Sequence, residues 1–380
     1  MPVWHEKVKD WVEKGELVFI GITQEQHPDR CRLFAQWKGF DFPILWDAFN
    51  LTDSKVVPNF IAIDEHGIVR STRPRRASFE EDFLAVAFEA PKQAVEPDFE
   101  AGACSFSDLH EHPSPISALS QHKDLDASVT ELEKRASADP EDAQTAFHAG
   151  VAHRLRYDSP EHRPSDFQSA IDHWTRALLL DPNQYIWRRR IQQYGPRMDK
   201  PYPFYTWTEQ AREEILARGE SPVVLLAELT GAELAEPRRG APPATDIPDE
   251  PDPKARIHRD EVGLIEIESA TAFDTSGKQP IASVHISLRT NRGRKAHWNH
   301  EAGPLVEVWV DAPTPRLMRI ESRDDVATSE GLQLLNFEIE LPAGETEMIL
   351  PSYALYYVCE GEAGKCVYLR QEFEILIQQR

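Results

Sequence analysis

The pattern of apolar and polar positions divides the chain into three segments. Residues 1–96 mix short apolar runs with helical spacing, which predicts alternating strands and helices. Residues 124–235 keep helical spacing and are rich in Ala, Leu, Glu and Arg, which predicts helices. Residues 259–380 alternate apolar and polar positions between turns that contain Gly and Pro, which predicts strands. The proline-rich stretches between these segments, 97–123 and 236–258, are expected to be linkers.

The first segment predicts the order helix, strand, helix, three strands, helix. The continuous apolar run Leu17–Ile22 is typical of a strand that is buried on both faces. Two further strands are expected at Phe42–Trp46 and Val57–Ile63, and the turn Asp64–Gly67 leads into the last strand, Gly67–Ser71. The three helices are expected at Lys7–Lys14, His27–Lys38 and Phe79–Phe88.

Three sequence runs of this segment follow one another: FIGIT (19–23), FPILWD (42–47) and VVPNFIAIDEHGIV (56–69). Their order and spacing resemble the redoxin branch of the thioredoxin fold, of the ResA/TlpA type. The resemblance implies that Pro58 is the cis-proline of that family. It also implies that Val57 and Pro58 present their backbone to a partner protein.

The thioredoxin-like family carries a C-x-x-C redox motif at the start of its first helix, and this motif is missing here. The chain begins at Met1, inside the expected first helix, so the central strand and the motif would lie upstream. We therefore expect a truncated reading frame whose upstream site holds C-x-x-C, or a selenocysteine encoded by UGA. A truncated start implies a periplasmic location, whereas a true start at Met1 implies the cytoplasm.

The second segment predicts a small helical array. Ala170, Trp174, Ala177 and Pro182 have the spacing of the second helix of a tetratricopeptide (TPR) repeat, which this segment resembles, and Gly150 supplies the small residue of the preceding helix. Two roles stay open for the segment, a scaffold that binds a protein partner or a spacer between domains. The helices are expected at Leu125–Ala138, Asp142–Arg156, Asp166–Leu180 and Gln184–Gln193.

The third segment predicts about eight strands, which favours an antiparallel β-sandwich. Cys359 ends one strand and Cys366 begins the next. The paired ends of two antiparallel strands lie close together, so a disulfide that closes the loop between them is geometrically plausible. The strands are expected at Gly263–Phe273, Ala282–Arg289, Leu305–Val310, Arg316–Ile320, Leu332–Glu340, Thr346–Leu350, Tyr353–Cys359 and Cys366–Ile377.

The stretch YALYYVCEGEAGKCVYLRQEFEI (353–375) carries a second resemblance. Its strand, short loop, second cysteine and outward strand are similar to the C-terminal part of the N-terminal domain of DsbD, a periplasmic thiol:disulfide interchange protein. That domain is an immunoglobulin-like sandwich whose cysteine pair passes electrons to partner proteins. The resemblance implies that Cys359 and Cys366 form this pair and that Tyr356 and Tyr357 pack near it.

The expected fold class is therefore multidomain. It combines a truncated α/β thioredoxin-like fold over residues 1–96, an all-α TPR-like segment over 124–235 and an all-β immunoglobulin-like sandwich over 259–380.

Two hypotheses for the function stay open, and with them the question of whether the chain is an enzyme. In the first, it is a thiol–disulfide oxidoreductase-like protein whose exchanging residues are Cys359 and Cys366. Val57, Pro58 and Tyr357 would then contact a redox partner protein. In the second, it is a non-catalytic interaction module with a structural disulfide. The acidic loop between the cysteines favours the second, because negative charge near a thiol raises its pKa.

Composition excludes several partners. Lys and Arg number 42 and Asp and Glu number 64, which gives a formal net charge of −22 that repels nucleic-acid phosphates. No apolar run approaches the roughly 20 residues of a membrane-spanning helix, so no membrane insertion is expected. His297 and His300 in HWNH, and His110 and His112, lack the further ligands of a metal site. We therefore expect no metal and no cofactor.

The remaining cysteines have weaker signals. Cys31 lies between Arg30 and Arg32, whose charges would lower its pKa and favour a reactive thiol; the alternative is an unreactive structural thiol. Cys104 falls in the expected linker, and a pairing with Cys31 stays open. The basic run Arg188–Arg190 is expected to be a solvated helix face.

Overall fold

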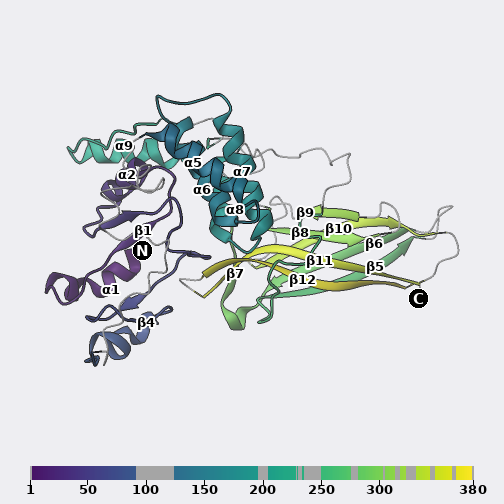
Figure 1. The fold of residues 1–380 in the computed structure, drawn as a ribbon. Coiled ribbons are helices and arrows are strands. Elements are labelled where there is room, and N and C mark those ends of the chain that lie inside the picture. The colour runs from purple at the N-terminus through teal and green to yellow at the C-terminus, as the bar shows by residue number, and fades with distance from the viewer. Residues whose placement is uncertain are drawn as a thin grey trace. The chain divides into compact units, whose positions relative to one another are not determined.

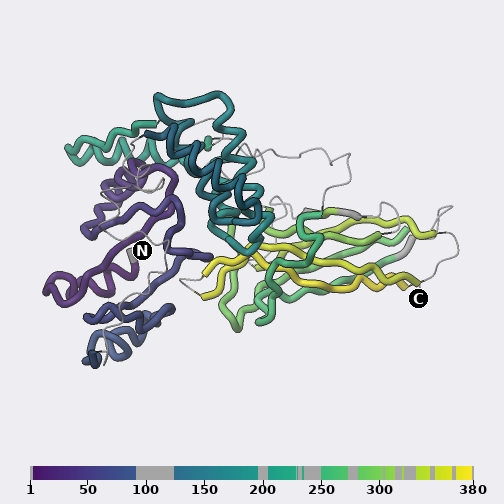
Figure 2. Tube along the Cα trace, viewed as in Figure 1, coloured from purple at the N-terminus to yellow at the C-terminus, as the bar shows by residue number. Residues whose placement is uncertain are grey.

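The computed structural model contains both helices and several antiparallel sheets (Figures 1 and 2). Its contacts define two units. The first comprises Met1–Ser54, Asn59–Asp181 and Tyr205–Leu229, and the second comprises Lys55–Pro58, Pro182–Phe204 and Thr230–Arg380. The predicted linker 97–123 lies outside the described residues. The structure describes residues 2–90, 124–195, 204–227, 229, 233–234, 250–274, 281–302, 304–312, 317–321, 331–342, 347–361 and 365–378.

The α/β part of the first unit has two small sheets among its described residues. Strands β1 and β2 pair in parallel, and β3 and β4 form a separate antiparallel hairpin. Trp4 and Val8 pack with Phe79 and Phe83 in a small apolar core. The elements are α1 (Pro2–Glu13), β1 (Gly21–Thr23), α2 (Pro28–Lys38), β2 (Ile44–Trp46), β3 (Ala62–Ile63), β4 (Val69–Ser71), η1 (Arg76–Ser78) and η2 (Glu80–Leu84).

The prediction that Leu17–Ile22 forms a strand buried on both faces was wrong. Only Gly21–Thr23 is a strand, and Val18 and Ile20 are 72% and 51% exposed. Within the described residues β1 pairs with a single strand, β2.

Two other predicted elements of this part are shorter than expected. The strand expected at Val57–Ile63 is reduced to Ala62–Ile63, because Pro58 has no amide donor and Val57 belongs to the second unit, where it pairs with Cys366. The last helix, expected at Phe79–Phe88, is a five-residue π-helical turn, Glu80–Leu84.

The helical part of the first unit follows the predicted spacing closely. Asp142 caps the N-terminus of α6, where its carboxylate accepts hydrogen bonds from the amides of Gln144 and Thr145. A Cβ on Gly150 would lie 2.4 Å from Cδ1 of Trp174, so the two helices touch at this glycine, as the sequence predicted. The elements are α5 (Leu125–Ala138), α6 (Ala143–Tyr157), α7 (Asp166–Leu180) and α9 (Trp207–Ala217).

The second unit has two antiparallel sheets that share one apolar core. One has the order β10-β6-β5 and the other the order β12-β11-β8-β9, with β7 also paired to β11. Val284 from the first sheet and Val308 and Val358 from the second lie in that core. The elements are α8 (Tyr185–Tyr194), β5 (Ile265–Asp274), β6 (Ile281–Thr290), η3 (Arg292–Arg294), β7 (Ala296–Trp298), β8 (Val306–Asp311), β9 (Leu317–Glu321), β10 (Leu332–Glu340), β11 (Glu347–Glu360) and β12 (Lys365–Gln378).

Two predicted strands of this unit are one strand in the structure. The strands expected at Thr346–Leu350 and Tyr353–Cys359 join in β11, which passes through Pro351 without a break. Strand β8 pairs with β11 along Ser352–Tyr356, so a proline just before that stretch removes no hydrogen bond to β8.

His297 and Trp298 of HWNH lie in β7, and Trp298 packs in the sheet core. One further prediction for this unit was wrong. The basic run of α8 is not a solvated face, because Arg189 and Arg190 are buried and the guanidinium of Arg188 lies 3.8 Å over the ring of Tyr368. Charged side chains with long apolar stems can pack in this way when the ring accepts the cation.

Among the helices of the described residues, none is long and apolar enough to cross a membrane.

Candidate functional site

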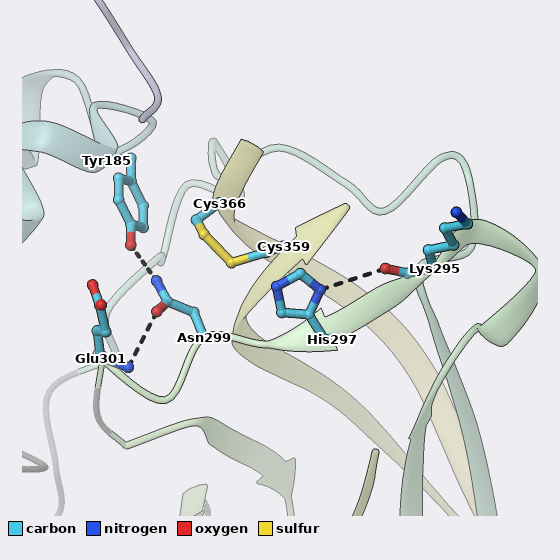
Figure 3. Close-up of a disulfide and its surroundings, with 7 residues drawn as sticks. All are labelled: Tyr185, Lys295, His297, Asn299, Glu301, Cys359 and Cys366. Atoms are coloured by element: carbon cyan, nitrogen blue, oxygen red, sulfur yellow. Dashed lines mark hydrogen bonds between the residues drawn. A yellow bond between two sulfur atoms is a disulfide. The ribbon is translucent and has the colours of Figure 1, made fainter. Parts of the chain in front are cut away.

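Cys359 and Cys366 are joined by a disulfide, the pairing that the predicted strand ends suggested. Cys359 lies near the end of β11 and Cys366 near the start of β12, and the two residues stand directly opposite each other in the ladder. Figure 3 shows the disulfide bridging the ends of these two strands. The hairpin therefore fixes both sulfur atoms relative to each other.

The two cysteines differ in their access to solvent. Cys359 is 3% exposed and pairs with β12 on one side and with His297 of β7 on the other. Cys366 is only partly buried. Cys366 is therefore the more exposed of the two cysteines.

The backbone of Val57 pairs with Cys366. The Cys366 amide donates to the Val57 carbonyl at 3.2 Å, in an isolated antiparallel bridge. The Val57–Pro58 peptide bond is cis, which confirms that part of the sequence prediction. The structure thus brings Val57 and Pro58 to the disulfide, although they are far from it in the sequence.

Tyr357 lies in an aromatic cluster around Cys366. Its ring is 4.5 Å from that of Tyr368, and its hydroxyl accepts a hydrogen bond from Nε2 of Gln192 at 3.1 Å. Tyr185 packs edge-on against the same ring. Because Tyr357 is only 5% exposed, its part is to pack the surroundings of the disulfide rather than to offer surface to a partner.

The expectation that Tyr356 packs beside the cysteine pair was wrong. Successive strand residues point to opposite faces, so Tyr356 points away from the face of Tyr357 and Cys359. It is fully buried in the sheet core against Trp298, and its hydroxyl donates to Oδ2 of Asp260 at 2.9 Å. Burial, followed by the negative charge of Asp260, raises the pKa of this hydroxyl.

Two residues that the sequence analysis did not assign to the site hold the turn after β7 (Figure 3). Asn299 donates from Nδ2 to the hydroxyl of Tyr185, and it accepts from the Glu301 amide at 3.2 Å. Burial raises the pKa of the Tyr185 hydroxyl, which keeps it neutral. The only sequence signal for Asn299 was its place in HWNH, and Tyr185 lay in a helix with no signal for this site.

His297 is the titratable side chain in register with the disulfide. It pairs with Cys359 in the β7–β11 ladder, so the two side chains lie on the same face, and its Nδ1 is 3.4 Å from the carbonyl of Lys295 (Figure 3). On the other side, Glu360 stands opposite Lys365, so the acidic residue beside Cys359 faces a cation across the ladder.

The other cysteines do not join this site in the described residues. Cys31 is a free thiol in α2, within 3.7 Å of Oγ1 of Thr23 and of the His27 carbonyl. Burial, together with the charge of Glu25, raises the pKa of this thiol to about 12, which favours the unreactive structural thiol over a thiol activated by its arginine neighbours. Cys104 lies outside the described residues, as do His110 and His112.

Comparisons with known proteins add little to this geometry. No protein-family model and no curated protein matches the chain. Among solved structures, the X-ray structure of a Northeast Structural Genomics Consortium target covers 30% of this chain and 86% of its own, at 11% identity and a TM-score of 0.20. A likeness of this score supports no conclusion about fold or function.

Proposed function

We propose that the chain is a thiol–disulfide exchange protein, and that Cys359 and Cys366 are its exchanging pair. The observation that carries the proposal is the disulfide itself, which closes a hairpin with one partly exposed and one buried cysteine. In exchange, a partner attacks one sulfur and the other leaves as a thiolate, and the difference in exposure between the two cysteines supports this division of roles.

We propose finer fold assignments on the same basis. The α/β part is a thioredoxin-like fold, supported by the parallel β1–β2 pair and the β3–β4 hairpin. The helices α5–α7 are a TPR-like array, supported by the packing of Gly150 against Trp174, and this array is a candidate surface for a protein partner. The two sheets that share a core are an immunoglobulin-like sandwich.

The exchange step follows from the access of the two sulfurs. A partner thiolate attacks Sγ of Cys366, a mixed disulfide forms between the partner and Cys366, and Cys359 leaves as a thiolate. A second partner thiolate then attacks the partner sulfur of the mixed disulfide. The partner ends as a disulfide, Cys366 leaves as the second thiolate, and two electrons have moved to the cysteine pair.

His297 is placed to serve the leaving sulfur. Cys359 is buried, and a charged thiolate is unfavourable in a buried place, so protonation stabilises this sulfur as it leaves. Histidine is the side chain that most readily exchanges protons near neutral pH, and His297 is the cross-strand neighbour of Cys359 on the same face. His297→Gln is expected to slow reduction of the disulfide while the disulfide still forms.

The test uses single-cysteine trapping with glutathione disulfide as the probe, in a background in which Cys31 and Cys104 are serine. Cys359→Ser leaves the thiol of Cys366 and is expected to form a mixed disulfide with glutathione. The matched variant Cys366→Ser leaves the buried thiol of Cys359 and is expected to react at least about tenfold more slowly. Mass spectrometry of the two variants over time gives both rates.

A structural disulfide is the alternative function for the pair, in a non-catalytic interaction module. It is favoured by the aromatic cluster of Tyr185, Tyr357 and Tyr368 around Cys366. It predicts that neither variant forms a mixed disulfide under native conditions and that dithiothreitol leaves the wild-type disulfide intact. That outcome would refute the exchange proposal.

A further inference from the structure

Three successive helices of the first unit bring one carboxylate and two imidazoles together. Glu133 lies on α5, His153 on α6 and His173 on α7, and one donor atom of each lies within 4.8 Å of the others. The His153 side chain is 3% exposed and that of Glu133 is 49% exposed, while His173 is partly buried. The cluster therefore extends from the buried imidazole of His153 to the half-exposed carboxylate of Glu133.

A buried carboxylate fixes the orientation of His153. Asp166, whose side chain is fully buried, lies 3.1 Å from Nδ1 of His153 and accepts two hydrogen bonds from Arg156, at 2.6 and 3.0 Å. Because Nδ1 of His153 faces Asp166, Nε2 is the ring nitrogen that points away from that carboxylate.

That nitrogen faces a second carboxylate. Nε2 of His153 lies 2.9 Å from Oε1 of Glu133. An imidazole with a carboxylate at each ring nitrogen needs a cation, either a second proton or a metal ion, to satisfy both carboxylates. The ring of His173 stacks on the ring of His153, with 5.5 Å between the ring centroids. A proton shared by Glu133 and His153 would give His173 no function, whereas a metal ion would use it as a third ligand.

We infer that Glu133, His153 and His173 bind a zinc ion, with water as the fourth ligand. Two imidazoles and a carboxylate suit Zn²⁺, whereas Ca²⁺ and Mg²⁺ prefer oxygen ligands alone. Tetrahedral ligands with bonds of about 2.0–2.2 Å lie roughly 3.3 Å apart. The half-exposed carboxylate of Glu133 can move by the small distance needed, while Asp166 holds His153 in place as a positioning residue.

The experiment is a zinc titration of the full chain after treatment with a chelator, followed by calorimetry. Glu133→Gln removes a ligand at a half-exposed position, so it keeps the fold, and Glu131→Gln on the same helix is its matched control. His173→Asn removes the second imidazole, and His162→Asn, at an exposed position before α7, is its control. Cobalt(II) in place of zinc gives a visible spectrum that reports tetrahedral coordination.

The wild type and both controls are expected to bind one zinc ion per chain. Glu133→Gln and His173→Asn are expected to lose at least about tenfold in affinity. The inference is overturned if the wild type shows no saturable binding, or if both ligand variants keep wild-type affinity. Binding that is lost only when His110 and His112 are replaced would place the metal elsewhere and would also overturn it.

Discussion

Replacing Gly150 by alanine tests the close approach of α6 and α7 at this position. A methyl group there would lie 2.4 Å from Cδ1 and 2.5 Å from Nε1 of Trp174. Trp174 is fully buried, so its indole can move away only by displacing its core neighbours. The substitution should therefore push α6 and α7 apart.

Two opposing effects set the size of the change. Alanine is more favourable than glycine in a helix interior by about 1 kcal/mol. Overpacking a filled core costs about 1–3 kcal/mol, and a contact more than 1 Å inside the usual separation of about 3.5–4.0 Å belongs at the upper end. We expect Gly150→Ala to destabilise this helix pair by about 2 kcal/mol.

Hydrogen exchange followed by mass spectrometry measures this effect locally. Peptides from α6 and α7 should exchange about 30-fold faster in Gly150→Ala, since each 1.4 kcal/mol corresponds to about a factor of ten. In a Trp174→Leu background the indole atoms are gone, and the same substitution should instead slow exchange through the helix preference of alanine. Unchanged or slower exchange of the single variant in the wild-type background would refute the reasoning.

Three further substitutions follow from buried polar contacts. Asp166→Asn removes the charge opposite the buried Arg156 and should cost about 3 kcal/mol in urea unfolding; a loss below about 1 kcal/mol would contradict this. Burial lowers the pKa of His148 from 6.5, so as the pH falls below that value only the unfolded chain takes up a proton, and the free energy of unfolding declines. His148→Gln should flatten this decline between about pH 7 and 5. An unchanged slope of the unfolding free energy against pH would contradict this prediction. Tyr357→Phe removes the hydrogen bond from Gln192 and should lower the free energy of unfolding in urea by about 1 kcal/mol. Thiol counting should show that the disulfide still forms. Loss of the disulfide would contradict this prediction, because it would mean that the hydroxyl is needed for the disulfide itself.

The sequence predicted the parts of the fold that depend on local spacing. The positions of α6 and α7, the contact of Gly150 with Trp174 and the closing of the Cys359–Cys366 hairpin all follow from residues close together in the chain. Such patterns depend on helical and strand periodicity, which a sequence shows directly.

The parts that were missed depend on distant residues. The pairing of Val57 with Cys366 and the packing of Tyr185 beside Asn299 leave no local pattern. Two readings of Cys31 stayed open because its flanking arginines were visible in the sequence, whereas the burial that raises the pKa of its thiol was not. The same limit applies to the histidines of α6 and α7, whose spacing alone does not reveal Glu133 on a third helix.

The reduction potential of the Cys359–Cys366 disulfide tests the central claim most directly. The wild-type chain is equilibrated in glutathione or dithiothreitol buffers of known potential, and the free thiols of the two cysteines are alkylated and counted by mass spectrometry. The exchange account predicts a midpoint more oxidising than about −300 mV, with Cys366 alkylated before Cys359. A midpoint well below about −300 mV, or a disulfide that resists dithiothreitol under native conditions, would contradict the account and leave the pair as a structural link.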